Sequence, residues 1–141
     1  GRRVNDYIPH FIAKKVVTTL IEKGKNPGEC RVLVMGITFK EDVSDIRNSK
    51  VADLVKELQD YSLVVNVVDP FADAEEVKSE YGIEMVSDTK GEYDVIILAV
   101  GHKIYRKMPS QELKNLSKGE LILFDIKGVL EGKVNQNYWK L

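Results

Sequence analysis

The chain has 141 residues, which is enough for one domain with a sizeable hydrophobic core. Its formal net charge is -1, so no basic excess favours nucleic acid or an anionic membrane surface as a partner. The sequence has no apolar run near the roughly 20 residues of a membrane span, and its single cysteine, Cys30, excludes an intrachain disulfide and favours a reducing cytoplasm.

The sequence pattern of residues 1–24 predicts a helix. Asn5 or Asp6 can cap its start, and Pro9 suits its first turn. Gly24 is a typical helix end. Apolar residues recur every four positions between these signals, at Ile8, Ile12, Val16 and Leu20. This helix is the only segment that could stand apart from the rest, and we interpret it as a connector that precedes the main domain, residues 25–141.

Short apolar runs then alternate with amphipathic ones. Continuous apolar strands indicate burial on both faces, which predicts an α/β fold: a Rossmann-like, doubly wound, mostly parallel sheet of about five strands with helices on both faces. The predicted strands are residues 31–35, 63–68, 82–86, 93–100 and 120–126, and the predicted helices are residues 49–58, 72–81 and 109–116. The polar tail, residues 131–141, is expected to dock one aromatic side chain on the body.

The loop of residues 36–49 leaves the carboxyl end of the first strand, where open α/β sheets place ligands. It is longer than the 2–6 residues usual for such a connection. It carries two cations, Lys40 and Arg47, that can hold a phosphate or carboxylate. The alternative is that both are solvated loop charges, with Asp42 or Asp45 as weak surface partners.

Other polar residues follow strands that end at the same edge of the sheet. His102 and Lys127 would converge there with Lys40, an arrangement that suits an anion, although each taken singly is typical of a surface residue. A complete dinucleotide site is not expected, because G-x-G-x-x-G is absent and Asp69 lies 33 positions after Gly36, beyond the usual spacing of about 20. Metal-ligand spacings and nucleophile motifs are also absent. The residues therefore predict a binding domain rather than a complete catalyst.

These stretches carry a family resemblance. The loop reads Gly36-Ile37-Thr38-Phe39-Lys40 and then Asp45-Ile46-Arg47-Asn48-Ser49, which resembles the pattern G-x-[TA]-F-K-x-x-x-x-D-x-R-x-S of the UDP-sugar 6-dehydrogenase family. Further matches in the same order are Val68-Asp69-Pro70, Ala99-Val100-Gly101-His102 and Phe124-Asp125-Ile126-Lys127. Lys127-Gly128 replaces an arginine pair of the UDP-glucose enzymes, so the chain is most similar to the UDP-N-acetylhexosamine branch.

The resemblance implies a role for each matched residue. Phe39 and Lys40 would contact a UDP-sugar, Lys127 would be a further substrate contact, and Arg47 would reach NAD near its phosphates. Residues 1–24 would be the end of a central linker and residues 25–141 a C-terminal UDP-sugar-binding domain.

The whole protein would then be an NAD-dependent homodimer in the cytoplasm, with an N-terminal NAD-binding domain in the same polypeptide. It would oxidise the C6 hydroxyl of a UDP-N-acetylhexosamine to a carboxylate for surface polysaccharide biosynthesis. The family's catalytic-cysteine loop is not within these residues, so we expect no turnover by this chain alone. Two alternatives are a stand-alone nucleotide-sugar binding module without catalysis, and an α/β domain whose loop charges are only solvated.

Overall fold

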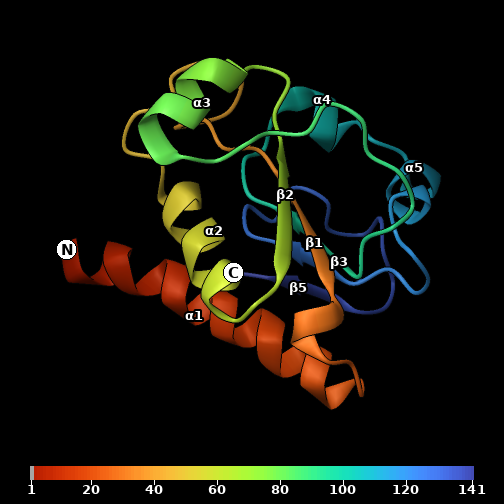
Figure 1. The fold of residues 1–141 in the computed structure, drawn as a ribbon. Helices are drawn as coiled ribbons and strands as arrows, with labels where there is room; N and C mark the ends of the chain where they lie inside the picture. The colour runs from red at the N-terminus through yellow and green to blue at the C-terminus, as the bar shows by residue number, and fades with distance from the viewer. Residues whose placement is uncertain (1) are drawn as a thin grey trace.

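The computed structural model describes residues 2–141, with side chains from residue 8 onward. One parallel sheet with the strand order β2-β1-β3-β4-β5 forms the centre of the molecule (Figure 1). Its strands are β1 (Arg31–Met35), β2 (Val64–Val68), β3 (Val95–Leu98), β4 (Leu123–Asp125) and β5 (Tyr138–Lys140). The register places Val32 of β1 between Val65 of β2 and Val95 of β3. The predicted Rossmann-like parallel sheet of five strands is confirmed.

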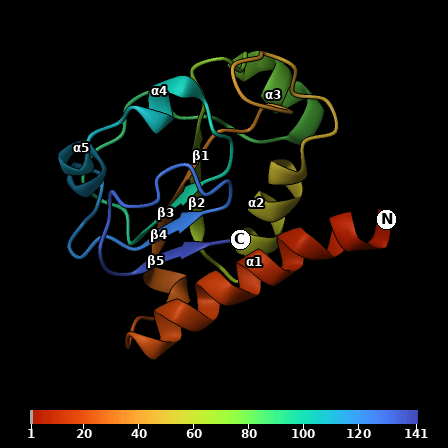
Figure 2. The same cartoon turned by 180° about the vertical axis from the view of Figure 1, so that it is seen from behind.

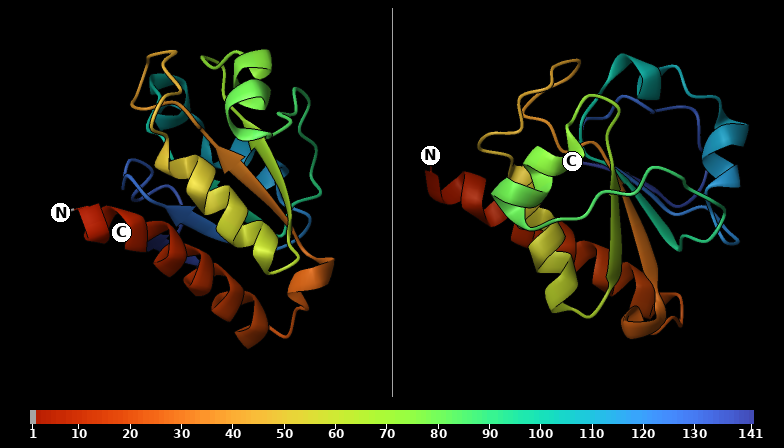
Figure 3. Two further views of the ribbon diagram at one scale, coloured as in Figure 1. Left: turned by 60° about the vertical axis from the view of Figure 1, so that its left-hand side comes forward. Right: turned by 45° about the horizontal axis from the view of Figure 1, so that its top comes forward.

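Helices cover both faces of the sheet, as predicted. The long helices α1 (Arg2–Glu22) and α2 (Lys50–Asp60) lie side by side on one face (Figure 3, left). The short helices α4 (Lys103–Arg106) and α5 (Ser110–Asn115) lie on the other side (Figure 2). Helix α3 (Ala74–Tyr81) sits beyond the end of β2, capped at its start by the Asp73 carboxylate and ended by Gly82 at a φ of 69°.

The alternation of side chains along the strands divides the core in two. Val32 and Val34 of β1 pack with α1 and α2, whereas Leu33 and Met35 pack with Tyr105 of α4 and the residues around α5. Successive strand residues point to opposite faces, so each central strand must be apolar throughout to be buried on both. This explains why the strands lack the alternation of a half-exposed sheet.

Helix α1 is packed against the domain rather than held away from it. Ala13, Val16 and Leu20 are fully buried in the same core as α2 and the sheet. Burial of a valine or leucine side chain contributes roughly 1.5–3 kcal/mol, so these contacts hold the helix firmly. The prediction that Asn5 or Asp6 caps this helix is wrong, because the helix begins at Arg2 and passes through Pro9.

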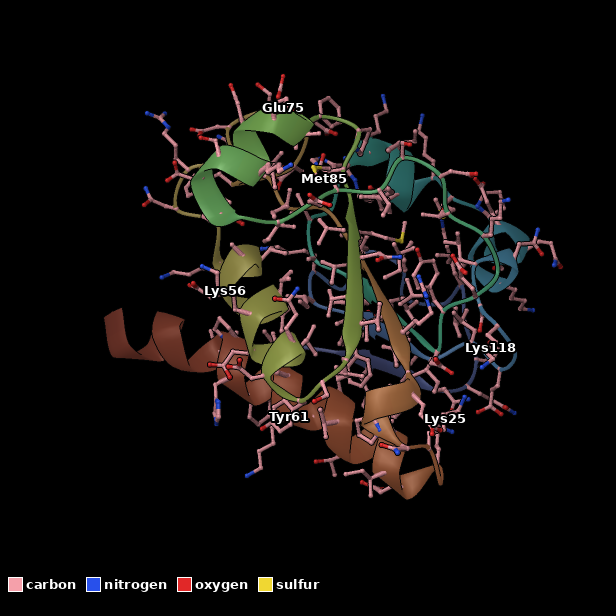
Figure 4. All side chains as sticks on the ribbon, in the orientation of Figure 1. Lys25, Lys56, Tyr61, Glu75, Met85 and Lys118 are labelled. Atoms are coloured by element: carbon pink, nitrogen blue, oxygen red, sulfur yellow. The ribbon has the colours of Figure 1, made fainter. Side chains whose placement is uncertain are left out.

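Two segments differ from the expectation. Residues 82–86 do not form a strand: they run along the outer side of β2, where Val86 N–H donates to Val67 C=O, and Met85 lies beside the upper part of β2 (Figure 4). The tail docks an aromatic as expected, since Trp139 stacks on Phe124 at 4.8 Å, but it does so as an additional strand, β5, paired with β4.

Candidate functional site

The candidate site lies at the carboxyl edge of the sheet, beside the point where the strand order reverses. The chain leaves β1 for β2 on one side and later adds β3 on the other, and ligands of open parallel sheets bind at such a point. In Figure 1 this edge faces the top of the view, toward α3 and α4. The loops that follow β1, β2, β3 and β4 all emerge there.

The loop that follows β1 and the loop that follows β3 cross in close contact. Gly36 follows β1 with a φ of 101°, a conformation that residues with side chains rarely adopt. A Cβ at this position would lie 2.6 Å from Val100 Cβ and 2.9 Å from Val100 N. The glycine is therefore required for close approach of two protein loops, and it leaves no cradle for a phosphate.

Asp69 holds the loop that follows β1. Its carboxylate is fully buried, and Oδ2 accepts hydrogen bonds from Ile37 N–H at 2.7 Å and Thr38 N–H at 3.1 Å. Oδ1 accepts from Phe71 N–H at 2.8 Å. These donors occupy both carboxylate oxygens, so Asp69 does more than end β2: it fixes the entry of the Phe39–Lys40 loop.

His102 is buried, so both expectations for it are wrong: it is not a surface residue, and it does not face an anion together with Lys40 and Lys127. The imidazole has no exposed area and lies 3.0 Å from Asp69 Oδ2 through Nε2. Its Nδ1 accepts a hydrogen bond from Asp42 N–H at 2.9 Å. A histidine with both ring nitrogens engaged by the protein has no group left to offer a ligand.

These residues do not fit a complete NAD site. A dinucleotide fold needs room for the pyrophosphate against the turn after β1 and an acid free to bind the ribose. Here Val100 fills the space beside Gly36, and both oxygens of the Asp69 carboxylate already accept hydrogen bonds from backbone N–H groups. The same turn, the one after β1, led the sequence to predict that this domain does not bind a dinucleotide by itself.

An open groove of about 260 Å³ brings together two of the predicted residues. Phe39, from the loop after β1, and Lys127, from the turn after β4, line it together with Ile8 and Pro9 of α1. The other lining residues include Asn48, Val51, Val100, Ile126 and Leu141. The Phe39 side chain is 59% exposed, a large apolar surface to leave in water. The groove therefore pairs an open aromatic wall with a cation, which suits a flat base joined to a phosphate.

The turn that carries Lys127 is held in the same way as the Phe39 loop. The buried Asp125 carboxylate accepts hydrogen bonds from Val129 N–H at 3.2 Å, Leu130 N–H at 2.7 Å and Tyr138 O–H at 2.6 Å. Lys127 is exposed, and neither it nor Lys40 makes an ion pair or side-chain hydrogen bond with residues 8–141. Both ammonium groups are thus available to an anion. Lys40 follows Phe39 directly but does not line the groove.

Arg47 lies in a different hollow, of about 600 Å³, among carboxylates. Its guanidinium, 81% exposed, makes a two-pronged contact with Asp45, with Nε at 3.0 Å and a terminal nitrogen at 2.9 Å. This hydrogen bonding lowers the pKa of Asp45 to about 2. Glu75, Glu76 and Glu80 of α3 line the same hollow, and Glu75 points outward from α3 in Figure 4. The structure therefore does not gather Arg47 with Phe39 and Lys127.

Among the side chains of residues 8–141, no group of three or more His, Cys, Asp or Glu could hold a metal ion, and within residues 2–141 no helix is long and apolar enough to cross a membrane.

A parallel sheet with a groove at its carboxyl edge, and with the dinucleotide position filled by its own side chains, defines a Rossmann-like α/β binding domain. Comparison with known families specifies it further: the model of the UDP-glucose/GDP-mannose dehydrogenase family, UDP binding domain, matches residues 33–132. The chain therefore belongs to this family, which confirms the resemblance found in the sequence.

Individual relatives agree with the predicted branch of the family. The chain is 44% identical to UDP-N-acetyl-D-glucosamine 6-dehydrogenase of Salmonella typhi over 131 residues, which cover 92% of this chain and 31% of the relative. It is 40% identical to Protein CapL of Staphylococcus aureus over 146 residues, 100% of this chain and 34% of the relative. The chain thus spans about a third of the length of the curated relatives it matches.

Solved structures support the fold. An NDP-N-acetyl-D-galactosaminuronic acid dehydrogenase from Methanosarcina mazei matches with a TM-score of 0.82 at 22% identity, over 99% of this chain and 30% of that one. A UDP-D-ManNAc dehydrogenase from Pyrococcus horikoshii matches with a TM-score of 0.77 at 21% identity, over 99% and 32%.

Sequence reasoning missed the supporting role of Asp69 and His102. Both follow a strand directly or after a few residues, which placed them correctly at the edge. Whether such a side chain turns inward or outward depends on the neighbouring loops, which no local pattern describes. The only available signal was the weak one that both occur within matched family motifs.

Proposed function

We propose that this chain is the UDP-sugar-binding part of an NAD-dependent UDP-N-acetylhexosamine 6-dehydrogenase, which oxidises the sugar C6 hydroxyl to a carboxylate for surface polysaccharide biosynthesis. The observation that carries this proposal is the groove where Phe39 and Lys127 meet, in a chain 44% identical to a UDP-N-acetyl-D-glucosamine 6-dehydrogenase. Phe39 offers the uracil an apolar face. Lys127 and Lys40 neutralise the pyrophosphate, which carries about two negative charges.

NAD is bound mostly by an N-terminal domain of the same polypeptide, with Arg47 reaching its phosphates from this side of a shared cleft. For that contact Arg47 exchanges Asp45 for a phosphate, which a guanidinium binds with the same two-pronged geometry. Closure of the two domains over the ligand excludes water from the reacting sugar. The whole protein acts as a homodimer in the cytoplasm. The one cysteine of this chain, Cys30, is a free thiol, which accords with a reducing compartment.

Calorimetry with UDP tests the binding half of the proposal on the 141-residue chain. We expect weak, saturable binding that Lys40→Ala and Lys127→Ala each weaken about tenfold, since a charge-assisted contact contributes roughly 1.5 kcal/mol or more. Lys107→Ala is the control, because Lys107 is exposed beyond α4, whereas Lys127 lines the groove and Lys40 directly follows the groove residue Phe39. Uridine, which lacks the phosphates, should bind the lysine variants and the unchanged chain alike. Absence of UDP binding at millimolar concentration would refute the assignment.

A protein that contains this chain together with the proposed NAD-binding domain tests the catalytic part of the proposal. With NAD and a UDP-N-acetylhexosamine it should form two NADH for each sugar oxidised. Arg47→Ala should raise KM for NAD more than KM for the sugar nucleotide, and equal increases would contradict the role given to Arg47. No NADH formation with any UDP-sugar would favour the stand-alone binding module instead.

A further inference from the structure

We propose that His102 is a positioning residue that fixes the Phe39–Lys40 loop in its ligand-binding shape before any ligand arrives. The inference rests on the proposed function, because it concerns the loop assigned there to the UDP-sugar. It extends that proposal by identifying what holds the loop. His102 follows β3, whereas the loop follows β1, so the imidazole ties together two segments that are 60 residues or more apart in the chain.

The hydrogen bonds fix which ring nitrogen carries the proton. Nδ1 accepts from the backbone N–H of Asp42 at 2.9 Å, so Nδ1 has no hydrogen of its own. Nε2 must then be the N–H, and it lies 3.0 Å from Asp69 Oδ2 and 3.3 Å from Thr38 Oγ1. The carboxylate therefore orients the ring, and the ring in turn presents a lone pair to Asp42.

The enclosure of the ring makes this arrangement rigid. The Phe71 ring lies 4.7 Å and the Tyr105 ring 5.5 Å from the imidazole, and the His102 and Asp69 side chains are fully buried. The Asp42 carboxylate also approaches the ring, with Oδ1 3.9 Å from Nδ1. It accepts from Lys103 N–H and lies 3.9 Å from the Arg106 guanidinium.

The loop uses a backbone conformation that has to be selected. Asp42 has a φ of 59° and Asn48 a φ of 56°, in a left-handed region that Asp and Asn enter more readily than other residues with side chains but that is still less populated than the right-handed one. Such conformations persist where the surroundings favour them. The Nδ1 bond acts on Asp42 itself, so it stabilises this conformation directly.

The same contacts reach the ligand residues. Thr38 Oγ1, beside Nε2, donates to Lys40 C=O at 2.9 Å, and Phe39 N–H donates to Asp45 C=O at 2.7 Å. Lys40 is thus held by Thr38 through its carbonyl, and it lies in the chain between Thr38 and Asp42, both of which contact His102. A loop ordered in advance loses less conformational entropy on binding, which strengthens affinity without any further contact to the ligand.

Two matched variants separate positioning from mere packing. In His102→Asn the side-chain oxygen can replace Nδ1 as the acceptor for Asp42 N–H, whereas in His102→Gln an amide N–H can replace Nε2 and the Nδ1 acceptor is lost. Both leave a smaller polar side chain in the same pocket. We expect UDP affinity to fall about tenfold in His102→Gln and by less than about threefold in His102→Asn. We also expect faster amide exchange at Asp42 in His102→Gln only.

Equal losses of affinity in the two variants, or Asp42 exchange unchanged in His102→Gln, would overturn the proposal in favour of a purely structural histidine. If both variants fail to fold, nitrogen NMR of the unaltered chain decides: the Nε2–H form of His102 supports the proposal, and the Nδ1–H form overturns it. Should the unaltered chain not bind UDP, the proposed function fails, and Asp42 amide exchange still decides whether His102 holds the loop.

Discussion

Gly36→Ala tests whether the crossing of the β1 and β3 loops is as tight as the geometry states. The added methyl group would lie 2.6 Å from Val100 Cβ and 2.9 Å from Val100 N, against the 3.5–4.0 Å usual between carbon atoms. One of these neighbours is backbone at the end of β3, so a side-chain rotation alone cannot relieve the overlap. The loops would have to separate by about 1 Å, or the substitution would leave them in collision.

Two costs add at this position. A φ of 101° costs an L-residue about 1–3 kcal/mol, and forcing a methyl group into a filled space costs about 1–3 kcal/mol more. We therefore expect Gly36→Ala to lower the free energy of unfolding by about 2–6 kcal/mol. This is a large fraction of the 5–15 kcal/mol typical of a domain.

Gly82→Ala is the matched control. Gly82 also has a positive φ, 69°, but a Cβ there would meet nothing within 4 Å. Gly82→Ala should therefore lower the free energy of unfolding only by the conformational cost, about 1–2 kcal/mol. Urea unfolding followed by circular dichroism and by the fluorescence of Trp139, the only tryptophan, gives both values. If Gly36→Ala is no more destabilising than Gly82→Ala, the claimed contact with Val100 is incorrect.

Three further predictions concern other parts of the chain. Tyr138→Phe should lower the free energy of unfolding by about 1–3 kcal/mol, because it removes one of three donors to the buried Asp125 carboxylate; Tyr61→Phe is the control, since its hydroxyl makes no hydrogen bond within residues 8–141. Asp45 should titrate with a pKa of about 2, and Arg47→Gln should return the midpoint of its titration, measured by carboxyl NMR, toward the ordinary value of 3.8. Because the pKa in the folded state is lowered, the stabilisation from the Asp45–Arg47 pair is complete above pH 3.8 and is lost as the pH falls through 2. Burial raises the pKa of the Cys30 thiol, so a disulfide reagent should modify it slowly in the folded chain and rapidly in urea, and equal rates would contradict its burial.

The sheet could be predicted from sequence because its signals are local. The run Arg31–Met35 is apolar and β-branched, and the structure gives β1 the same bounds. The failures are residues whose structure depends on distant partners. β5 is a short segment at the end of a largely polar tail, and it becomes a strand because Leu123 of β4 pairs with Tyr138. Residues 82–86 have strand-like composition, but the backbone hydrogen bond from Val86 N–H to Val67 C=O of the edge strand β2 does not by itself make a strand.

In the candidate site too, some features follow from local sequence signals and others depend on distant residues. Lys127 could be placed at the same edge as Lys40, and hence beside the loop that also carries Phe39, because strand ends of a parallel sheet share one edge. The separation of Arg47 could not be foreseen, since it depends on the path of the loop between Phe39 and Ser49. That path is set by the Phe39 N–H bond to Asp45 C=O and by the left-handed Asp42, neither of which has a sequence signature.

The family motifs combine two kinds of residue with opposite locations. In the matches Val68-Asp69-Pro70 and Phe124-Asp125-Ile126-Lys127 the acids, Asp69 and Asp125, are buried, and their oxygens accept hydrogen bonds from backbone N–H groups of the following or neighbouring loop. The cation and the aromatic, Lys127 and Phe39, are exposed on those loops. A carboxylate facing the groove would repel a pyrophosphate, whereas one buried below it shapes the loop and has its charge compensated by N–H dipoles. The acids can therefore appear in the motifs of an anion-binding site without weakening it, provided that they point into the protein.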